Sequence, residues 1–194
     1  MNREYESYRL FLAVKLSMQV KENLLQLKAA VPEYAGLKWT CEQNLHLTLR
    51  FIGDWPVAGL PVLISSVGKL RFKPLELEVK GLGLFKRAQQ TILWAGFAEA
   101  ALLQRLKTEL DQLLESGCGL TGEKGAYTPH ITLARLKRTG ASLTVQAELE
   151  KLRVQAQRQS FGKFSAAGFS LFKSELHPQG VRHAVIHDFP RNID

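Results

Sequence analysis

One short pattern occurs twice in this chain: a histidine, an aliphatic residue, a threonine and a leucine. The two copies are His46-Leu47-Thr48-Leu49 and His130-Ile131-Thr132-Leu133, 84 positions apart. Successive side chains of a β-strand point to opposite faces, so each histidine should share a face with its own threonine. A buried strand has no packing reason to repeat imidazole and hydroxyl on its polar face. The repeat therefore predicts a cleft lined by two imidazoles and two hydroxyls.

This set of groups is suited to proton transfer at an oxyanion. A neutral imidazole accepts a proton and an imidazolium donates one, and both forms exist near a pKa of about 6.5. The threonine hydroxyls can donate hydrogen bonds to oxygens whose negative charge the transition state must stabilise. Chemistry of this kind requires no metal.

Strict alternation also assigns the neighbours of the two motifs to faces. Arg50 falls on the face of His46, beyond the cleft. Arg135 falls on the face opposite His130, unless a β-bulge or the strand end re-aims it. The residues assigned to the buried face of the first motif strand are Leu45, Leu47, Leu49 and Phe51.

The composition is that of an ordinary soluble globular protein, with 194 residues, 45% hydrophobic and 23% charged. This length suits one domain, or two small lobes that share a core. The net charge of +8 fits either a solvated basic surface or a polyanionic ligand, and composition does not choose between them. Cys41 and Cys118 fit neither a metal site nor a disulfide framework. With no signal peptide and no membrane span in the sequence, we expect a cytoplasmic protein with reduced thiols.

Hydrophobic periodicity and turn residues predict alternating strands and helices. The expected strands are 9–16, the segment of each motif, 75–80, 91–97, 164–176 and 181–189, with turns at 53–56 and 177–180. The expected helices are 17–30 with Ser17 as N-cap, 57–70, 99–114 and 143–156. Strand–helix–strand order in both halves predicts an α+β fold of two pseudo-symmetric lobes. Each lobe would be a mostly antiparallel sheet with outer helices, and the two would enclose a central cleft.

Taken together, these segments resemble the 2H phosphoesterase superfamily, and more closely its branch of RNA 2′,3′-cyclic phosphodiesterases, also called bacterial 2′-5′ RNA ligases. The resemblance covers nearly the whole chain, so residues 1–194 are expected to form a single domain. The segments that carry it are 9–14, Trp39 with 44–53, 81–85 with 92–94, 128–135 and 174–180. One departure is His183, where relatives often carry an aromatic residue such as tyrosine.

The resemblance implies metal-independent hydrolysis of an RNA or nucleoside 2′,3′-cyclic phosphate to the 2′-phosphomonoester, with reversible 2′-5′ RNA ligation as a further activity. His130 would be the general base and His46 the general acid, while Thr48, Thr132 and Arg135 would bind the phosphate. The partners would be RNA ends or nucleotides with a 2′,3′-cyclic phosphate. No cofactor, metal or membrane is expected, and the protein is expected to be a monomer.

Other interpretations of these residues stay open. Phe11, Trp39 and Phe85 could stack a base, although aromatic residues in strands more often belong to the core. The histidines near the C-terminus, which are His177, His183 and His187, lack the spacing of a zinc site. A 2′-5′ oligonucleotide phosphodiesterase could use the same four motif residues. An RNA-binding module with little catalysis is disfavoured, because it would need lysines and arginines rather than paired imidazoles.

Overall fold

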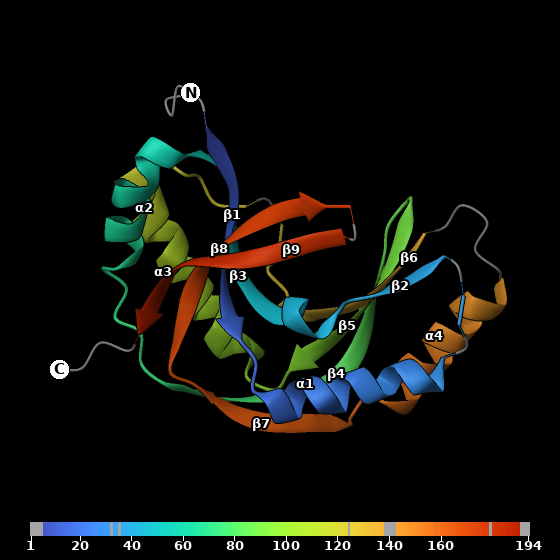
Figure 1. Ribbon diagram of the computed structural model, residues 1–194. Helices are drawn as coiled ribbons and strands as arrows, with labels where there is room; N and C mark the ends of the chain where they lie inside the picture. The colour runs from blue at the N-terminus through green and yellow to red at the C-terminus, as the bar shows by residue number, and fades with distance from the viewer. Residues whose placement is uncertain are drawn as a thin grey trace.

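Two antiparallel sheets hold the two motifs, one motif in each sheet (Figure 1). The computed structural model describes residues 6–31, 33–34, 36–123, 125–137, 143–178 and 180–190. In the first sheet the strand order is β3 (His46–Pro56), β1 (Ser7–Lys15), β8 (Gly168–His177) and β9 (Gly180–Pro190). In the second it is β2 (Leu37–Trp39), β6 (Ile131–Lys137), β5 (Gln90–Phe97), β4 (Leu75–Lys86) and β7 (Ser160–Ala166).

The two sheets repeat one arrangement. The order β3-β1-β8-β9 corresponds to β6-β5-β4-β7, and β2 is added at the outer edge of β6. The registers agree as well, since Thr48 lies opposite Ala13 of β1 and Thr132 lies opposite Trp94 of β5. The predicted α+β fold of two pseudo-symmetric antiparallel lobes is therefore confirmed.

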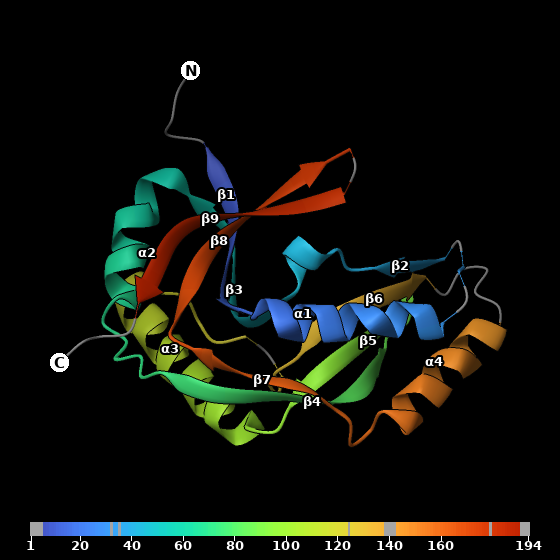
Figure 2. The ribbon, with the colours of Figure 1, turned by 60° about the horizontal axis from the view of Figure 1, so that its bottom comes forward.

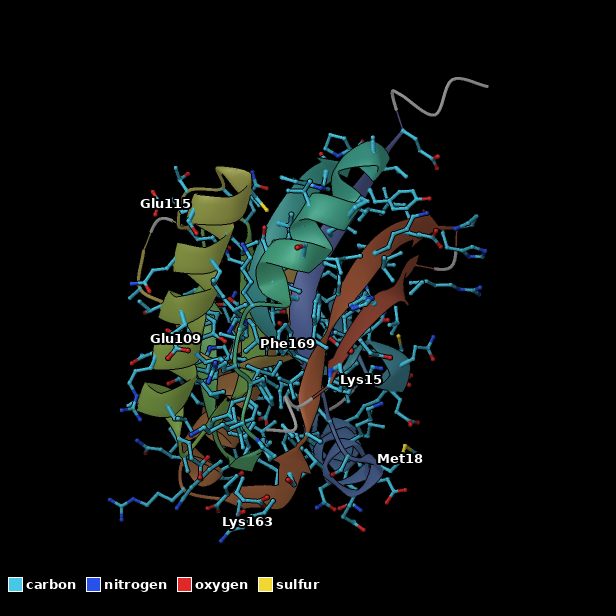
Figure 3. The ribbon with its side chains drawn as sticks, turned by 90° about the vertical axis from the view of Figure 1, so that its left-hand side faces the viewer. Lys15, Met18, Glu109, Glu115, Lys163 and Phe169 are labelled. Carbon is cyan, nitrogen blue, oxygen red and sulfur yellow. The ribbon has the colours of Figure 1, made fainter. Side chains whose placement is uncertain are left out.

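The helices interleave the two lobes. Helix α1 (Met18–Leu25) follows β1 of the first sheet but packs on β7 of the second, where α4 (Leu143–Gln155) packs on β4 (Figures 1 and 2). Helix α3 (Ala100–Cys118) follows β5 of the second sheet but packs on β3 of the first and on α2 (Leu60–Val67). Figure 3 shows α2 and α3 side by side, with the exposed Glu109 and Glu115 on the outer side of α3. One hydrophobic core results, because the main cluster contains leucines from both motif strands.

Helix termini follow local signals in the sequence. The Ser17 hydroxyl accepts a hydrogen bond from the Val20 amide at 3.4 Å, so the predicted N-cap is confirmed. The predicted helix 17–30 is an α-helix only to Leu25 and continues as a 3₁₀ turn, η2 (Gln26–Ala30). Similarly, the predicted helix 57–70 begins as a 3₁₀ turn, η4 (Val57–Gly59). Helix α3 runs beyond the predicted residue 114 until Gly119, whose φ of +67° ends it.

The predictions of strand ends were less accurate. The predicted turn at 53–56 is wrong, because β3 continues to Pro56 and Gly53 accommodates a register shift with φ of +84°. The predicted strand 75–80 continues to Lys86 as β4. The single strand predicted at 164–176 is two strands, because the chain leaves the second sheet at Ala166 and enters the first at Gly168. Apolar patterning shows that a residue is buried, but it does not show in which sheet.

Among the described residues, no helix is long and apolar enough to cross a membrane. Both cysteines are free thiols; Cys41 is exposed and Cys118 is half-buried.

Candidate active site

Each motif strand contains a β-bulge at the leucine that follows the motif threonine. Thr48 lies opposite Ala13, but Arg50 lies opposite Leu12, so Leu49 is an extra residue in β3. In β6, Thr132 lies opposite Trp94 and Ala134 lies opposite Leu93, so Leu133 is the extra residue. A bulge of one residue reverses the alternation of side chains beyond it. Both lobes use this device at equivalent positions.

The first bulge corrects two assignments made by strict alternation. Arg50 turns to the core face and is only 4% exposed, rather than sharing the face of His46. Phe51, expected in the core, is 57% exposed and approaches Phe11 with ring centroids 6.2 Å apart. We call the face that carries the histidine and the threonine of each motif the site face, and Phe51 belongs to it.

The second bulge re-aims Arg135. Beyond Leu133 the alternation places Arg135 on the site face with His130 and Thr132. The positive charge of Arg135 lowers the pKa of both His46 and His130, which places it within electrostatic reach of both motifs. Arg135 and Phe51 occupy equivalent positions in the two lobes, five residues after their histidines. One lobe thus presents a cation where the other presents an aromatic ring.

The two imidazoles are oriented by the same main-chain contact. Nδ1 of His46 lies 2.8 Å from the carbonyl oxygen of Asn44, and Nδ1 of His130 lies 2.8 Å from that of Thr128. A carbonyl only accepts, so Nδ1 of each neutral ring carries the hydrogen and Nε2 carries the lone pair. In His46 this Nε2 lies 3.0 Å from Oγ1 of Thr48, whose hydroxyl therefore donates to it. Both rings present Nε2 for proton transfer.

Burial and neighbouring cations make both imidazoles harder to protonate. The pKa of His46 falls to about 4, mainly because the ring is buried and then because His183, His130 and Arg135 repel added charge. Burial also lowers the pKa of His130, and Arg135 and Arg87 lower it further. The carbonyls of Asn44 and Thr128 oppose these shifts. The effect of His130 on the pKa of His46 and the contact between β3 and β6 indicate that the two motifs form one site.

Aromatic rings enclose each imidazole. Phe11 lies against His46 with ring centroids 4.9 Å apart, and the edge of His183 meets the same imidazole at 5.3 Å. His130 meets Phe85 at 5.0 Å and Trp94 at 6.1 Å, and Phe85 stacks on Trp94 at 5.0 Å. Sequence reasoning missed Trp94 and His183 as site residues. The sequence places Trp94 in a strand, but only the register of β5 with the motif strand β6 shows that it lies opposite Thr132.

Comparisons with known proteins agree with this geometry. The family described as "LigT like Phosphoesterase" matches residues 14–94, and the "AKAP7 2'5' RNA ligase-like domain" matches residues 60–180. A Methanocaldococcus jannaschii protein named RNA 2',3'-cyclic phosphodiesterase is 28% identical, with 93% of this chain and 99% of that protein covered. An Aeropyrum pernix protein of the same name is 34% identical, with 78% and 85% covered. A crystal structure of a Thermus thermophilus protein superimposes with a TM-score of 0.77 at 29% identity, over 94% of this chain and 97% of that one.

The chain belongs to the LigT-like phosphoesterases of the 2H superfamily. The family suggested by the two motifs is therefore confirmed.

The stacking candidates of this LigT-like phosphoesterase divide into two groups. Phe11 and Phe85 lie against the two histidines, as described above. Trp39 instead lies opposite Ala134 of β6 and packs against the main core, so its prediction as a base-stacking residue is not supported by its position. The bulge explains the difference, because it turns Ala134 and its partner toward the core.

The three histidines near the C-terminus do not converge. His183 contacts His46, whereas His187 packs against Phe189 with ring centroids 4.6 Å apart. Over the ranges that the structure describes, no three His, Cys, Asp or Glu side chains gather as metal ligands would.

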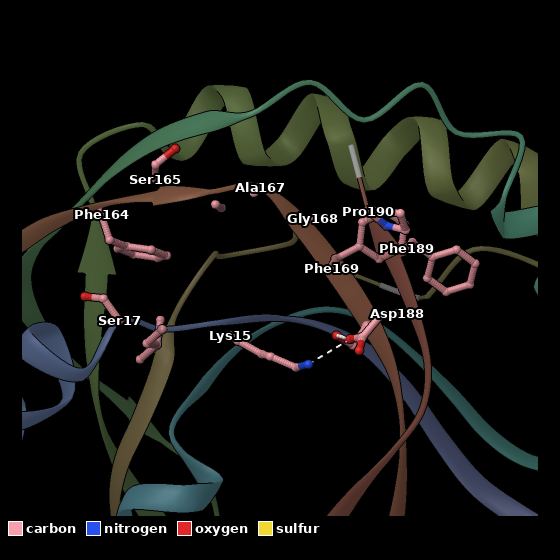
Figure 4. A pocket seen from close by; sticks show the side chains of 13 residues that line it. Lys15, Ser17, Phe164, Ser165, Ala167, Gly168, Phe169, Asp188, Phe189 and Pro190 are labelled. Atoms are coloured by element: carbon pink, nitrogen blue, oxygen red, sulfur yellow. Dashed lines mark hydrogen bonds and ion pairs between the residues drawn. The ribbon is translucent and has the colours of Figure 1, made fainter. Parts of the chain in front are cut away.

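A pocket of about 410 Å³ borders the site of the LigT-like fold without including a motif residue (Figure 4). It lies where β7 crosses to β8, and its walls include Ser17, Phe164 and Phe169. At its edge, Nζ of Lys15 forms an ion pair with Asp188 at 2.7 Å, drawn as a dashed line in Figure 4. Lys15 lines the pocket and lies directly opposite His46 in the sheet, so the pocket extends to the residue beside the first motif.

Proposed function

We propose that this LigT-like phosphoesterase hydrolyses RNA and nucleoside 2′,3′-cyclic phosphates to 2′-phosphomonoesters. The observation that carries the proposal is the pair of imidazoles, one from each lobe, which both present Nε2 and share Arg135. The names of the M. jannaschii and A. pernix relatives support the choice of substrate. RNA ends, a monomeric state and a cytoplasmic location belong to the same proposal.

In this mechanism the cyclic phosphate lies between the two motifs. Nε2 of His130 accepts a proton from water, whose oxygen bonds to phosphorus as the bond to the 3′ oxygen breaks. Nε2 of protonated His46 donates its proton to that 3′ oxygen, which leaves a free 3′ hydroxyl and a 2′-phosphate. The hydroxyls of Thr48 and Thr132 and the guanidinium of Arg135 stabilise the non-bridging oxygens.

The low pKa of His46 has a consequence for this assignment. The acid must be charged when the substrate reacts, yet the free imidazole has a pKa of about 4. The negative charge of the bound phosphate raises that pKa, because an opposite charge favours the protonated ring. Thr48, which donates to Nε2 in the free protein, then turns its hydroxyl toward the phosphate. Substrate binding thus charges the acid.

The same groups can act in reverse. When a 2′-phosphate lies in the site, neutral His46 can take the proton of the 3′ hydroxyl and protonated His130 can protonate the leaving oxygen. Cleavage of a 2′-5′ bond in an oligonucleotide would follow this reverse route, with the 5′ oxygen as the leaving group, whereas 2′-5′ ligation would follow the forward route with a 5′ hydroxyl in place of water. A binding module would not need two imidazoles fixed in one tautomer, so we place catalysis ahead of RNA binding alone.

The product of a nucleoside 2′,3′-cyclic phosphate tests the proposal. We expect 2′-monophosphate from cyclic AMP and CMP (the 2′,3′ isomers), separated from the 3′ isomer by chromatography. A variant that lacks both His46 and His130 is the control for contaminating activity. Mainly 3′-phosphate would mean that the two histidines have each other's roles. Absence of hydrolysis of either substrate by the wild-type protein would refute the proposed function.

A further inference from the structure

The two catalytic motifs lie in different sheets, and no strand pairing in the described residues joins β3 to β6. The separation of the two imidazoles must therefore be set by other contacts. In-line displacement depends on this separation, because a shift of about 1 Å in a reacting group can cost about a hundredfold in rate.

One side chain links the main chains of the two motifs directly. The hydroxyl of Tyr127 donates a hydrogen bond to the carbonyl oxygen of Thr48 at 2.7 Å. Tyr127 immediately precedes Thr128, whose own carbonyl orients His130. Because β3 is an edge strand, the outer side of Thr48 faces no neighbouring strand, and the tyrosine supplies the hydrogen bond instead.

The hydroxyl of Tyr127 stays protonated and can therefore always donate its hydrogen bond. Burial, and then the charge of Glu123, raise the pKa of Tyr127 well above its usual value, so the phenol keeps its proton at any physiological pH. The Nζ of Lys107 lies over the Tyr127 ring at 5.9 Å from its centroid, and Gln104 donates to the Tyr127 carbonyl at 3.2 Å. The first contact holds the ring of Tyr127 against α3, and the second holds its main chain there.

An ion cluster with buried cations and partly exposed carboxylates supports the same junction. Arg50, which the bulge turns inward two residues after Thr48, pairs with Asp111 of α3 at 2.9 Å and with Glu123 at 3.1 Å. It also donates to the carbonyl of Thr121 at 2.5 Å. Lys107 pairs with the same two carboxylates, at 2.5 Å and 3.3 Å. The cluster thus joins β3 to the loop that leads into the second motif.

We propose that Tyr127 is a positioning residue: its bond to the Thr48 carbonyl sets the distance between the two imidazoles, and the Arg50 cluster braces this link. The inference rests on the proposed function and adds to it a residue outside both motifs. Tyr127 touches neither reacting atom, so its effect on the rate must pass through the relative placement of His46 and His130.

The test is Tyr127→Phe, which removes the hydroxyl and keeps the ring. We expect kcat for a nucleoside 2′,3′-cyclic phosphate to fall about tenfold to a hundredfold, with KM changed less than about threefold. The same substitution in a His130→Ala background should cost less than about threefold, since one imidazole has no partner to be aligned with. Tyr8→Phe, on β1 away from the second motif, is the matched control and should leave kcat unchanged.

A second measurement does not depend on turnover. In the wild-type protein, His130→Ala should raise the pKa of His46 in an NMR titration, because it removes a repulsive charge. In the Tyr127→Phe background the same substitution should raise it less, because the rings have moved apart.

Three outcomes would overturn the proposal: wild-type kcat in Tyr127→Phe, an equal loss in both backgrounds, or an unchanged coupling of the two histidines. If the wild-type protein shows no hydrolysis, the proposed function fails, and the titration alone decides whether Tyr127 positions the motifs.

Discussion

Each motif imidazole donates the hydrogen of Nδ1 to a main-chain carbonyl, and in the proposed mechanism its Nε2 exchanges a proton with the reactants. Replacing His46 or His130 by alanine should lower kcat by about 10²- to 10⁴-fold, the usual contribution of a general acid or base. Thr48→Ala and Thr132→Ala should cost less, because hydroxyls stabilise charge without moving a proton. Steady-state kinetics would check this, with the exposed His177→Ala as the control. A histidine variant that kept more than about a tenth of the activity would contradict its assigned role.

Arg135 lowers the pKa of both motif histidines and, in the proposed mechanism, binds the phosphate. Arg135→Gln removes a charge that lowers both pKa values, so both limbs of the pH profile of kcat/KM should move to higher pH. Loss of a hydrogen bond to a charged group, about 1.5–3 kcal/mol, should also raise KM about tenfold to a hundredfold. Arg105→Gln removes the same charge from the exposed side of α3 and is the control. Unmoved limbs with an unchanged KM would place Arg135 outside the site.

At the scale of secondary structure, the ring of Trp94 packs directly against the backbone of β4 at Gly83. A Cβ on Gly83 would lie 2.0 Å from the Trp94 ring, which stacks on Phe85 and borders His130. Gly83→Ala should therefore displace the indole, lower the free energy of unfolding by about 1–3 kcal/mol and reduce kcat.

Urea unfolding and kinetics of the same samples would test this expectation. Gly122→Ala is a suitable control, because its Cβ would meet its nearest atom at 3.8 Å. Equal stability and kcat for Gly83→Ala and wild type would show that Trp94 can move without affecting His130.

For the whole molecule, the buried histidines make stability depend on pH. The pKa of His46 is about 4 in the folded protein and about 6.5 when unfolded, so the unfolded chain binds the proton more readily. This stability is fully present above pH 6.5 and is lost as the pH falls from 6.5 toward 4. For His46 alone the loss amounts to about 3 kcal/mol at pH 4.

His46→Asn should therefore have a flatter dependence of unfolding free energy on pH than the wild type. Urea unfolding at several pH values between about 7 and 4 would measure the difference in unfolding free energy between the two proteins. The contributions of other acid-sensitive groups are the same in both proteins and cancel in this difference. Parallel curves for the two proteins would show that the pKa of His46 is not lowered by folding.

The sequence alone was enough to propose the catalytic groups and to predict the kind of fold. His46 and Thr48, or His130 and Thr132, are two residues apart, and the alternation of a strand is reliable over so short a distance. Ser17 could likewise be recognised as a cap, because its bond to Val20 is local. Two lobes followed from the repeated order of elements, since each amphipathic element must bury its apolar face against another.

Only the tertiary structure decided what lies beyond each motif. The bulges at Leu49 and Leu133 depend on the register with β1 and β5. They place Arg50 and Phe51 on the faces opposite to those that strict alternation assigns, and they place Arg135 on the site face, which alternation alone left open. The break between β7 and β8 likewise depends on which sheet each strand pairs with. Contacts of Tyr127 with Thr48 and of His183 with His46 join residues 79 and 137 positions apart. Hydrogen bonds between distant segments set these positions, and a local pattern of residue types carries no information about them.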